Sequence, residues 1–369
     1  MAALPDRGAT RREVEDLLRD VERGVPAGPG VAAARAAGMG AALAALPPGR
    51  LVLPTSGSTS HPRLVVRTVS SWTASFAAFT AVSGLGGGGE ETVWAPGPAS
   101  STMTLFASWH ALASGWSLRA DGPWRGVPDA DLSDVTSLHA VPAVADQVLA
   151  AVEEGRLPAL RTIVVAGAAS PAGLRERARR LGVATVEYYG AAELSFVAID
   201  PDGGGLTPFP QVRVRARRGC LEVASPWTCQ GYLAGDGPLV HGDDGWAGVG
   251  DRGEWDGERV RVHGRGGGVT VGGVTVHLAD VESVLRRVPG VADVVAVAVD
   301  SPHLGGAVAA VVEPVPSHDP GPLRAALYEA ARKELVPAAR PRRHGVAPLA
   351  RTTGGKADRA RVAALLAAG

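Results

Sequence analysis

Residues 136–189 have the sequence TSLHAVPAVADQVLAAVEEGRLPALRTIVVAGAASPAGLRERARRLGVATVEYY. Within this stretch, short apolar runs alternate with helical patterns: the runs lie at 136–141, 162–166 and 184–189, and the helical patterns at 143–154 and 171–181. Apolar runs of strand length that alternate with helices are typical of βαβ units, whose strands lie parallel. The stretch therefore predicts an α/β fold built on a mainly parallel sheet.

Further strands and helices are expected on both sides of this stretch. Upstream, helices are predicted over residues 11–24 and 31–46, strands over 51–53 and 64–66, and a largely buried helix over 101–114. After about residue 205 the texture changes, because apolar and charged residues alternate, as in Val260-Arg261-Val262-His263. Such alternation indicates half-exposed antiparallel strands.

A glycine-rich run at 264–268 is the candidate linker between two domains, because glycine reorients at low torsional cost. A compact pattern follows it, with a helix at 280–287, strands at 291–299 and 306–312, and a helix at 321–334. We therefore predict a large N-terminal αβ domain over 1–264, with a mainly parallel sheet and a small β-barrel-like part. A small, mobile α+β domain over 265–369 would follow.

Composition excludes several classes of protein. The 369 residues include 37 basic and 37 acidic side chains, so no net charge draws the chain to nucleic acid. Two cysteines cannot form a disulfide framework, and the nine histidines show no metal-ligand spacing. The uncharged run at 92–118 contains prolines and hydroxyl residues, which favours a loop leading into a buried helix over a membrane span. We expect a cytoplasmic protein, since the first residues lack the apolar stretch of a signal peptide.

Lysine is rare in this chain. Among the 37 basic residues only Lys333 and Lys356 are lysines, and the rest are arginines. In so arginine-rich a chain, a retained lysine is a sharper signal than it would be elsewhere.

The most specific segment is Thr55-Ser56-Gly57-Ser58-Thr59-Ser60-His61-Pro62-Arg63, between two expected strands. Its hydroxyls and backbone N–H groups suit a polyphosphate, although the composition alone equally fits a polar turn. It is not a P-loop, because the Gly-x-x-x-x-Gly-Lys pattern is absent. Residues 84–89 satisfy Gly-x-Gly-x-x-Gly but have no strand before them and no helix after, so we interpret them as a loop.

The order of residues in this segment resembles the phosphate-binding motif of the adenylate-forming superfamily, which includes acyl-CoA synthetases and other AMP-dependent ligases. Three further segments resemble motifs of the same family in the expected order: Tyr188-Tyr189-Gly190-Ala191-Ala192-Glu193, then Asp244 to Gly253 running on to Gly264-Arg265, and finally Arg351-Thr352-Thr353-Gly354-Gly355-Lys356-Ala357-Asp358-Arg359. Gly167-Ala168-Ala169 and Gly231-Tyr232 match weaker family positions. Four ordered motifs are specific where one alone would not be.

The resemblance implies a nucleotide site. The phosphate-binding residues would be Thr55, Ser56, Gly57, Ser58 and Thr59, assisted by Arg63. Tyr189 would stack on the adenine, with the segment 167–169 (Gly167, Ala168 and Ala169) on the other side and Gly190 and Ala192 in the same motif. Asp251 would accept hydrogen bonds from the ribose hydroxyls, and Arg265 would donate to the same region.

The resemblance also implies the reaction. Glu193 would ligate Mg²⁺, and Lys356 would lie between the carboxylate of an acid and the α-phosphate of ATP. Bringing two anions together is chiefly a matter of positioning and charge neutralisation. The implied activity is an ATP-dependent acid–thiol ligase that makes an acyl-AMP and transfers the acyl group to coenzyme A.

This sequence departs from the family pattern at several positions. Ser60 replaces a glycine and Arg63 a lysine, while Ala192 replaces a threonine whose hydroxyl would touch the α-phosphate. Gly266 to Gly268 replace hinge acids. A hydrogen bond lost at Ala192 would weaken transition-state binding by about 0.5–1.5 kcal/mol.

The acid itself is not identified by the sequence. The expected pocket lies along the helix at 101–114, with Ser101, Met103, Phe106 and Trp109 as candidate lining residues, for which core packing is the alternative. Gly272 to His277 resembles a stretch of o-succinylbenzoate–CoA ligases, the leading named possibility. Two alternatives stay open: an adenylation enzyme that loads the phosphopantetheine thiol of a carrier protein, and a nucleotide-binding remnant without catalysis.

Overall fold

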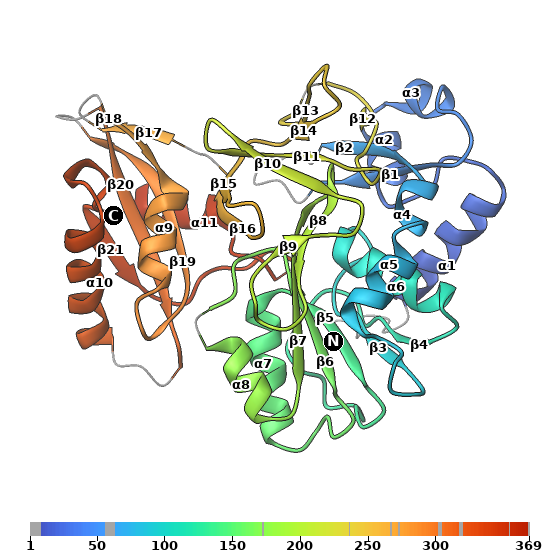
Figure 1. The fold of residues 1–369 in the computed structure, drawn as a ribbon, viewed down its shortest axis with the longest axis horizontal. Helices are drawn as coiled ribbons and strands as arrows, with labels where there is room; N and C mark the ends of the chain where they lie inside the picture. The colour runs from blue at the N-terminus through green and yellow to red at the C-terminus, as the bar shows by residue number, and fades with distance from the viewer. Residues whose placement is uncertain are drawn as a thin grey trace.

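The computed structural model describes residues 9–55, 63–171, 173–235, 237–265, 268–271, 274–301, 305–316, 320–353 and 355–367. The predicted phosphate-binding residues Ser56, Gly57, Ser58 and Thr59 lie outside these residues, as do Ser60, Gly266, Gly267, Gly272, Gly273 and Gly354. Figure 1 shows a large N-terminal part and, beside it, a smaller C-terminal part that carries the orange and red segments.

The main sheet has the predicted βαβ core. Its strand order is β4-β3-β5-β6-β7-β8-β9. The strands from β4 to β7 are parallel, and β8 and β9 add antiparallel strands at the other edge. Their bounds are β3 Thr92–Trp94, β4 Ser117–Arg119, β5 Ser137–Ala140, β6 Thr162–Ala166, β7 Ala184–Ala191, β8 Ser195–Asp200 and β9 Thr207–Pro208. The prediction of an α/β fold with a mainly parallel sheet is confirmed.

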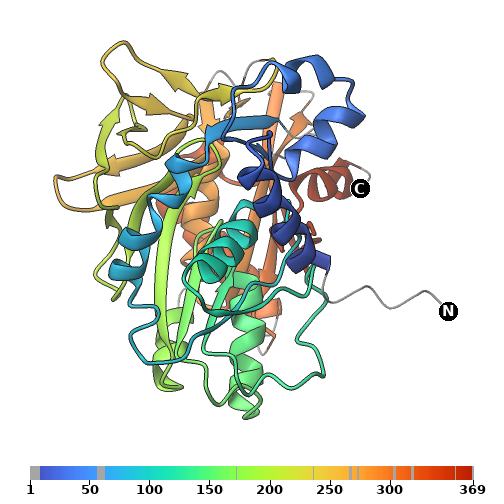
Figure 2. The ribbon, with the colours of Figure 1, turned by 90° about the vertical axis from the view of Figure 1, so that its right-hand side faces the viewer.

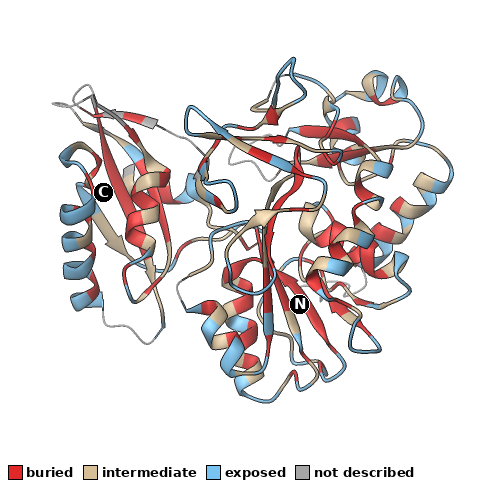
Figure 3. Ribbon diagram, viewed as in Figure 1, coloured by how far each residue is buried: buried red, intermediate tan, exposed pale blue. Residues whose placement is uncertain are grey.

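Helices cover both faces of this sheet, so its central strands are buried on both sides. Helices α7 (Pro142–Glu153) and α8 (Leu174–Arg180) pack on Leu138, Ile163 and Val165. On the opposite face, α5 (Phe76–Ser83) and α6 (Thr102–Ala113) contribute an aromatic core that meets Val164 and Val186. The burial colours of Figure 3 show this red interior between pale blue outer helix faces.

A second layer of strands lies above the main sheet in Figure 1. Strands β1 (Arg50–Pro54) and β2 (Leu64–Thr68) form an antiparallel hairpin, and β12 (Gly231–Tyr232) pairs with β2. The other strands follow the order β13-β14-β11-β15-β16, with β10 on β11. Their bounds are β10 Arg213–Arg217, β11 Cys220–Ala224, β13 Val240–His241, β14 Ala247–Gly248, β15 Asp251–Trp255 and β16 Val260–Arg265.

The predicted barrel-like part is not a closed barrel. Within the residues that the structure describes, neither of these sheets closes on itself. Asp251 of β15 pairs with Arg265 of β16, and β16 is an edge of its sheet. The alternating pattern predicted antiparallel strands correctly, but closure depends on which edges meet, and local alternation carries no information about that.

The second of the two predicted N-terminal helices is divided in the structure. Helix α1 covers Ala9–Glu22, while the expected helix over 31–46 is divided into α2 (Gly30–Ala36) and α3 (Gly40–Ala44). Gly38 lies between them with φ +74°, a left-handed conformation that ends a helix at little cost for glycine. Helix α4 (Ser70–Thr73) similarly precedes α5.

The C-terminal part has a core of its own. Strands β19 (Val291–Ser301), β20 (Gly305–Pro314) and β21 (Arg343–Val346) form a sheet between helices. One face packs on α9 (Leu278–Arg286) and α10 (Pro320–Glu334), the other on α11 (Arg359–Ala367). Successive residues of β19 alternate between these cores, with Val294 in one and Val295 in the other. The remaining elements are β17 Gly268–Val271, β18 Val274–His277 and a 3₁₀ turn at Pro337–Ala339.

In the side view of Figure 2 the blue N-terminal helices lie on the side of the molecule that faces the viewer. None of the described helices is both long and apolar enough to cross a bilayer. The uncharged run at 92–118 instead forms β3, a loop and the buried helix α6, as predicted.

Two buried histidines are expected to make the fold sensitive to acid. Burial lowers the pKa of His110 to about 4 and that of His139 to about 3, from 6.5. Below about pH 6.5 these histidines therefore bind protons in the unfolded chain but stay neutral in the folded protein. The free energy of unfolding falls as the pH drops. We expect His139 to account for about 2 kcal/mol of the loss between pH 7 and pH 5. In urea unfolding, the free energy of unfolding of His139→Leu should fall less between pH 7 and pH 5 than that of wild type. An equal fall in both proteins would contradict this.

Candidate active site

The β1–β2 hairpin holds the ends of the predicted phosphate loop together. The backbone N–H of Thr55 donates to the carbonyl of Arg63 at 2.8 Å. Thr55 is half-buried and Arg63 is exposed. The structure thus places these two predicted residues at the mouth of the hairpin, while the phosphate-binding role of the residues between them stays a prediction.

The turn between β7 and β8 presents the predicted metal ligand. Gly190 lies so close to β8 that an added Cβ would come 2.2 Å from the carbonyl oxygen of Ser195, which explains a glycine there. Glu193 follows in the turn and is only 3% exposed. The hydroxyl of Tyr232 donates to its Oε1 at 2.9 Å, and the N–H of Leu239 donates to that hydroxyl at 3.2 Å. Burial and Glu193 raise the pKa of Tyr232, so its proton stays on the donor.

A fully buried arginine joins this turn to the β1–β2 hairpin, which we call the phosphate hairpin because it carries the predicted phosphate loop. Arg67 of β2 is 1% exposed and donates to the carbonyl oxygens of Ala192, at 3.2 Å, and of Trp227, and to Ser71 Oγ at 3.1 Å. Burial lowers its pKa to about 10, against the opposing fields of Cys229 and Glu193, so the guanidinium stays charged at neutral pH. The sequence analysis did not identify this residue; a charge inside the run Leu64-Val65-Val66-Arg67 was the available signal.

The predicted adenine and ribose residues contact each other. The hydroxyl of Tyr189 on β7 donates to Oδ2 of Asp251 on β15 at 2.7 Å. Asp251 is 6% exposed, and its backbone pairs in register with Arg265. Two segments more than sixty residues apart are thereby joined at one end of the main sheet.

Lys356 of the C-terminal part reaches the same end of the sheet. A Cβ added to Gly167, which follows β6 with φ +87°, would lie 2.9 Å from Lys356 Cε and 3.4 Å from its Nζ. The lysine side chain therefore runs across the Gly167 backbone, beside the exposed Ala168 and Ala169. Since Ala166 and Tyr188 are paired on neighbouring strands, this places the ammonium group next to the Tyr189 segment.

The loop that carries Lys356 rests on α7. A Cβ on Gly355, whose φ is +79°, would approach Val141 Cγ2 to 2.9 Å and Val144 Cγ2 to 3.2 Å. Beside this contact lies a cavity of about 320 Å³. It is lined from the N-terminal part by Pro123, Trp124, Arg125, Ala143, Val144 and Gln147, and from the lysine loop by Arg351, Thr352, Thr353 and Gly355.

The predicted acyl-pocket residues lie mostly in packing positions. Phe106 and Trp109 are 3% and 5% exposed and meet Trp72 and Phe76 edge to face in the aromatic core. Ser101 caps α6, accepting the N–H of Thr104 at 3.4 Å. Met103 is half-buried against the α7 core. These packing and capping contacts are sufficient to explain why the four residues are present. That they line a pocket for the acid substrate stays a prediction.

The Glu193 carboxylate fits a magnesium site of a particular kind. Mg²⁺ is usually held by one or two carboxylates together with substrate phosphates. A carboxylate offers about four lone-pair positions, so Glu193 can accept from Tyr232 and still ligate a metal. The described residues contain no cluster of three or more His, Cys, Asp or Glu side chains that would hold a metal unaided.

Two family models match this chain, one in the N-terminal part and one in the C-terminal part. Residues 50–224 match the AMP-binding enzyme family, and residues 280–356 match the AMP-binding enzyme C-terminal domain. A salicylyl-CoA synthase / salicylate adenylyltransferase of Streptomyces sp is 29% identical over 295 residues, which cover 70% of this chain and 52% of the relative. The chain spans about half the length of the curated relatives it matches.

Solved structures show the same fold. An Escherichia coli MenE variant, an o-succinylbenzoate–CoA synthetase with bound OSB-AMS, superposes with a TM-score of 0.71 and 23% identity, covering 86% of this chain and 69% of that one. The amide bond synthetase McbA of Marinactinospora thermotolerans gives a TM-score of 0.70 and 25% identity, covering 86% and 69%.

Proposed function

Because the chain belongs to the AMP-binding enzyme family, we propose that it activates a carboxylic acid with ATP and transfers the acyl group to coenzyme A. In the first half-reaction a carboxylate oxygen attacks the α-phosphorus of ATP. The bond from that phosphorus to the bridging oxygen of the β-phosphate breaks, and pyrophosphate leaves. In the second, a thiol sulfur attacks the acyl carbon, the bond to the AMP oxygen breaks, and the thiol proton passes to solvent.

The single observation that carries this proposal is the position of Lys356. Its side chain crosses Gly167 at the end of the sheet where Tyr189 and Asp251 also meet. An ammonium group there would neutralise the carboxylate and the α-phosphate as they approach each other. Lysine suits this role because its charge is compact and its stem flexible.

The other predicted residues would hold the nucleotide. We propose that Thr55 to Thr59, with Arg63, bind the β- and γ-phosphates, and that Tyr189 supports the adenine. The hydrogen bond from Tyr189 fixes one oxygen of Asp251, which orients the carboxylate toward the ribose hydroxyls. Arg265, in register with Asp251, would donate to the same region.

Glu193 is the proposed magnesium ligand, held in place by Tyr232. When bound, Mg²⁺ would neutralise charge on the phosphate oxygens. The chain's own contribution is orientation: Tyr232 fixes one oxygen of Glu193, and Arg67 ties the carbonyl of Ala192 to the phosphate hairpin.

An alanine at Gly355 should slow acyl-adenylate formation. The new Cβ would overlap Val141 and Val144 at a positive φ, so the lysine loop could not rest on α7. We expect about 10-fold slower ATP–pyrophosphate exchange, because small misplacements of a reacting group cost this much or more. Gly38→Ala, at a positive φ with open space around it, is the matched control and should leave exchange unchanged. Equal rates for wild type and Gly355→Ala would refute the contact.

The proposed function is tested by product formation with a panel of acids. Aromatic acids such as salicylate and o-succinylbenzoate, which resemble the named substrates of the relatives, are supplied with ATP, Mg²⁺ and coenzyme A alongside aliphatic acids of varied length. The expected products are AMP, pyrophosphate and an acyl-CoA thioester. If no acyl-CoA forms but the acyl group is transferred to the phosphopantetheine thiol of a carrier protein, the carrier-loading alternative is favoured. ATP binding without pyrophosphate release for any acid would indicate the non-catalytic remnant.

A further inference from the structure

The segment that carries Lys356 is a short hairpin with a defined backbone. Arg351 and Ala357 form an antiparallel bridge. The N–H of Thr352 donates to the carbonyl of Lys356 at 2.7 Å, and that of Gly355 to the carbonyl of Thr352 at 2.9 Å. We call the described residues 351–353 and 355–358 the lysine hairpin. Its backbone bonds set its local shape but leave open how it is oriented on the rest of the C-terminal part.

Arg351 fixes the first end of the lysine hairpin to the sheet. Its Nη1 donates to Asp293 Oδ2 on β19 at 2.8 Å, and its Nη2 donates to Glu313 Oε2 on β20. The three side chains are between 17% and 25% exposed, so they are only partly screened by water. Arg286 of α9 also pairs with Asp293, at 3.6 Å, so that two carboxylates and two guanidinium groups meet here.

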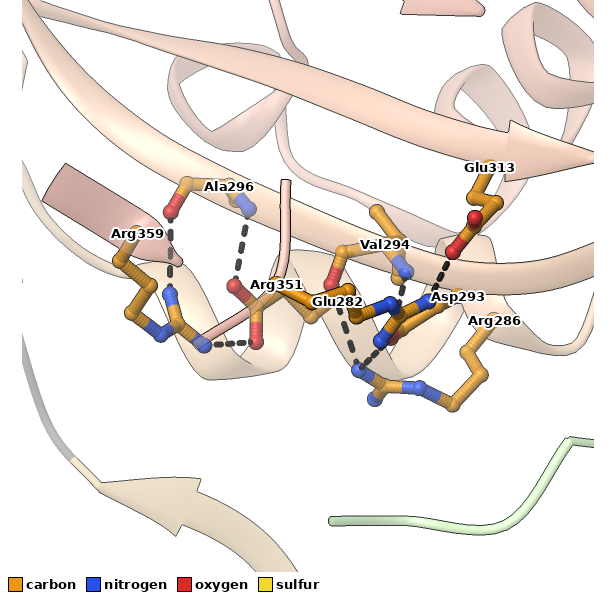
Figure 4. A network of polar contacts seen from close by, with 8 residues as sticks. All are labelled: Glu282, Arg286, Asp293, Val294, Ala296, Glu313, Arg351 and Arg359. Carbon is orange, nitrogen blue, oxygen red and sulfur yellow. Dashed lines mark hydrogen bonds and ion pairs between the residues drawn. The ribbon is translucent and has the colours of Figure 1, made fainter. Parts of the chain in front are cut away.

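Arg359 fixes the other end. Its Nη2 lies 2.6 Å from Glu282 Oε2, and its Nη1 donates to the carbonyl of Ala296 at 3.3 Å. Glu282 is 6% exposed on its side chain and accepts the N–H of Ala296 through its other oxygen at 2.8 Å. Figure 4 shows Arg359 at the left end of this network and Arg351 near its middle, with Asp293, Glu313 and Arg286 to the right.

The apolar anchors of the segment lie outside the hairpin. Leu349 before it and Val362 after it are both buried against β19 and β20. Loss of either arginine would therefore release the hairpin between anchors that still hold the chain.

We propose that Arg351 and Arg359 are positioning residues for acyl-adenylate formation, holding the Lys356 hairpin so that its ammonium group lies at Gly167. The inference rests on the proposed function. Neither arginine touches the nucleotide; each acts through the orientation of Lys356. The hairpin is thus fixed on one side by two arginine clamps and on the other by the contact of Gly355 with Val141 and Val144.

The test compares the two half-reactions in Arg351→Ala and Arg359→Ala. Arg287→Ala is the control, because Arg287 pairs with Glu334 in the same domain at an exposed site. We expect Arg351→Ala to lower kcat of ATP–pyrophosphate exchange by about 10- to 100-fold, as expected for a misplaced catalytic group, with KM for ATP changed less than about 3-fold. Thioester formation from a preformed acyl-adenylate should stay within about 3-fold of wild type, since that step does not use Lys356. Arg351→Lys should recover part of the exchange rate.

A second readout does not depend on activity. Amide hydrogen exchange at Thr352, Gly355 and Asp358 reports whether the hairpin is held. In Arg351→Ala these amides should exchange at least about 10-fold faster, while α10 keeps its protection. Wild-type protection in the hairpin would overturn the inference, as would equal loss of both half-reactions together with loss of protection in α10. If the wild-type protein shows no exchange with any acid, the proposed function fails, and the amides still decide whether the clamp exists.

Discussion

Replacing Lys356 with alanine is expected to slow acyl-adenylate formation by about 10³-fold, at the upper end of what removal of one charge-stabilising group costs. The lysine side chain lies across Gly167, and the alanine variant has no cation on that side chain. Two anions would then approach each other without the charge that neutralises them. Thioester formation from a preformed acyl-adenylate should change little, because the phosphoryl chemistry is complete at that stage.

The chain supplies its own control for this experiment. Lys333, at the end of α10, is exposed and is the other lysine of the sequence. Lys333→Ala should leave both half-reactions unchanged. Lys356→Arg should recover little, because a planar guanidinium does not replace a compact ammonium group. A Lys356→Ala protein that exchanges pyrophosphate like wild type, or that loses both half-reactions equally, would contradict the assigned role.

Replacing Arg67 with methionine is expected to destabilise the protein by about 3 kcal/mol or more. The change leaves the carbonyls of Ala192 and Trp227 without their donor and removes the cation that faces buried Glu193. Urea unfolding should show the loss directly. The exposed pair of Arg261 with Glu254 provides a control, and Arg261→Met should cost less than about 1 kcal/mol.

Pairing this change with Glu193→Gln separates the two causes. If the field of Arg67 stabilises the Glu193 carboxylate, the double variant should be more stable than the two single losses predict when added. Strict additivity would show that the carbonyl contacts alone account for the effect. A loss below about 1 kcal/mol in Arg67→Met would contradict the structural role altogether.

Local patterns predicted the elements that local forces determine. The apolar runs at 136–141, 162–166 and 184–189 became β5, β6 and β7 in a parallel sheet, because their length and alternation with helices leave few other arrangements. Helix boundaries were less predictable. The single helix expected over 31–46 is interrupted at Gly38, whose left-handed conformation cannot be recognised from apolar spacing.

Long-range contacts could not be predicted from periodicity. Tyr232 meets Glu193 across 39 positions, and Arg67 meets Trp227 across 160. Such pairs follow from how sheets stack, and a pattern of neighbouring residues contains no information about stacking. The resemblance to a family identified Glu193, Asp251 and Lys356 as candidates. The contacts of Tyr232 with Glu193 and of Arg67 with Ala192 became visible only in three dimensions.

The domain boundary at 264/265 and the hinge stay proposals. Gly266 and Gly267 lie outside the described residues. Strand β16 ends just before them and strand β17 begins just after them. The separate hydrophobic cores of the two parts are consistent with rotation of one against the other. Such a rotation would withdraw Lys356 from Gly167 and open the site to the thiol.

We propose that a carboxylate oxygen attacks the α-phosphorus of ATP at the site where Lys356 meets Gly167. The most direct measurement uses a carboxylic acid labelled with ¹⁸O in both carboxyl oxygens, with ATP, Mg²⁺ and coenzyme A, followed by mass spectrometry of the AMP released. Our account predicts that each AMP carries one ¹⁸O atom from the acid. Thioester formation with label in inorganic phosphate and none in AMP would contradict it.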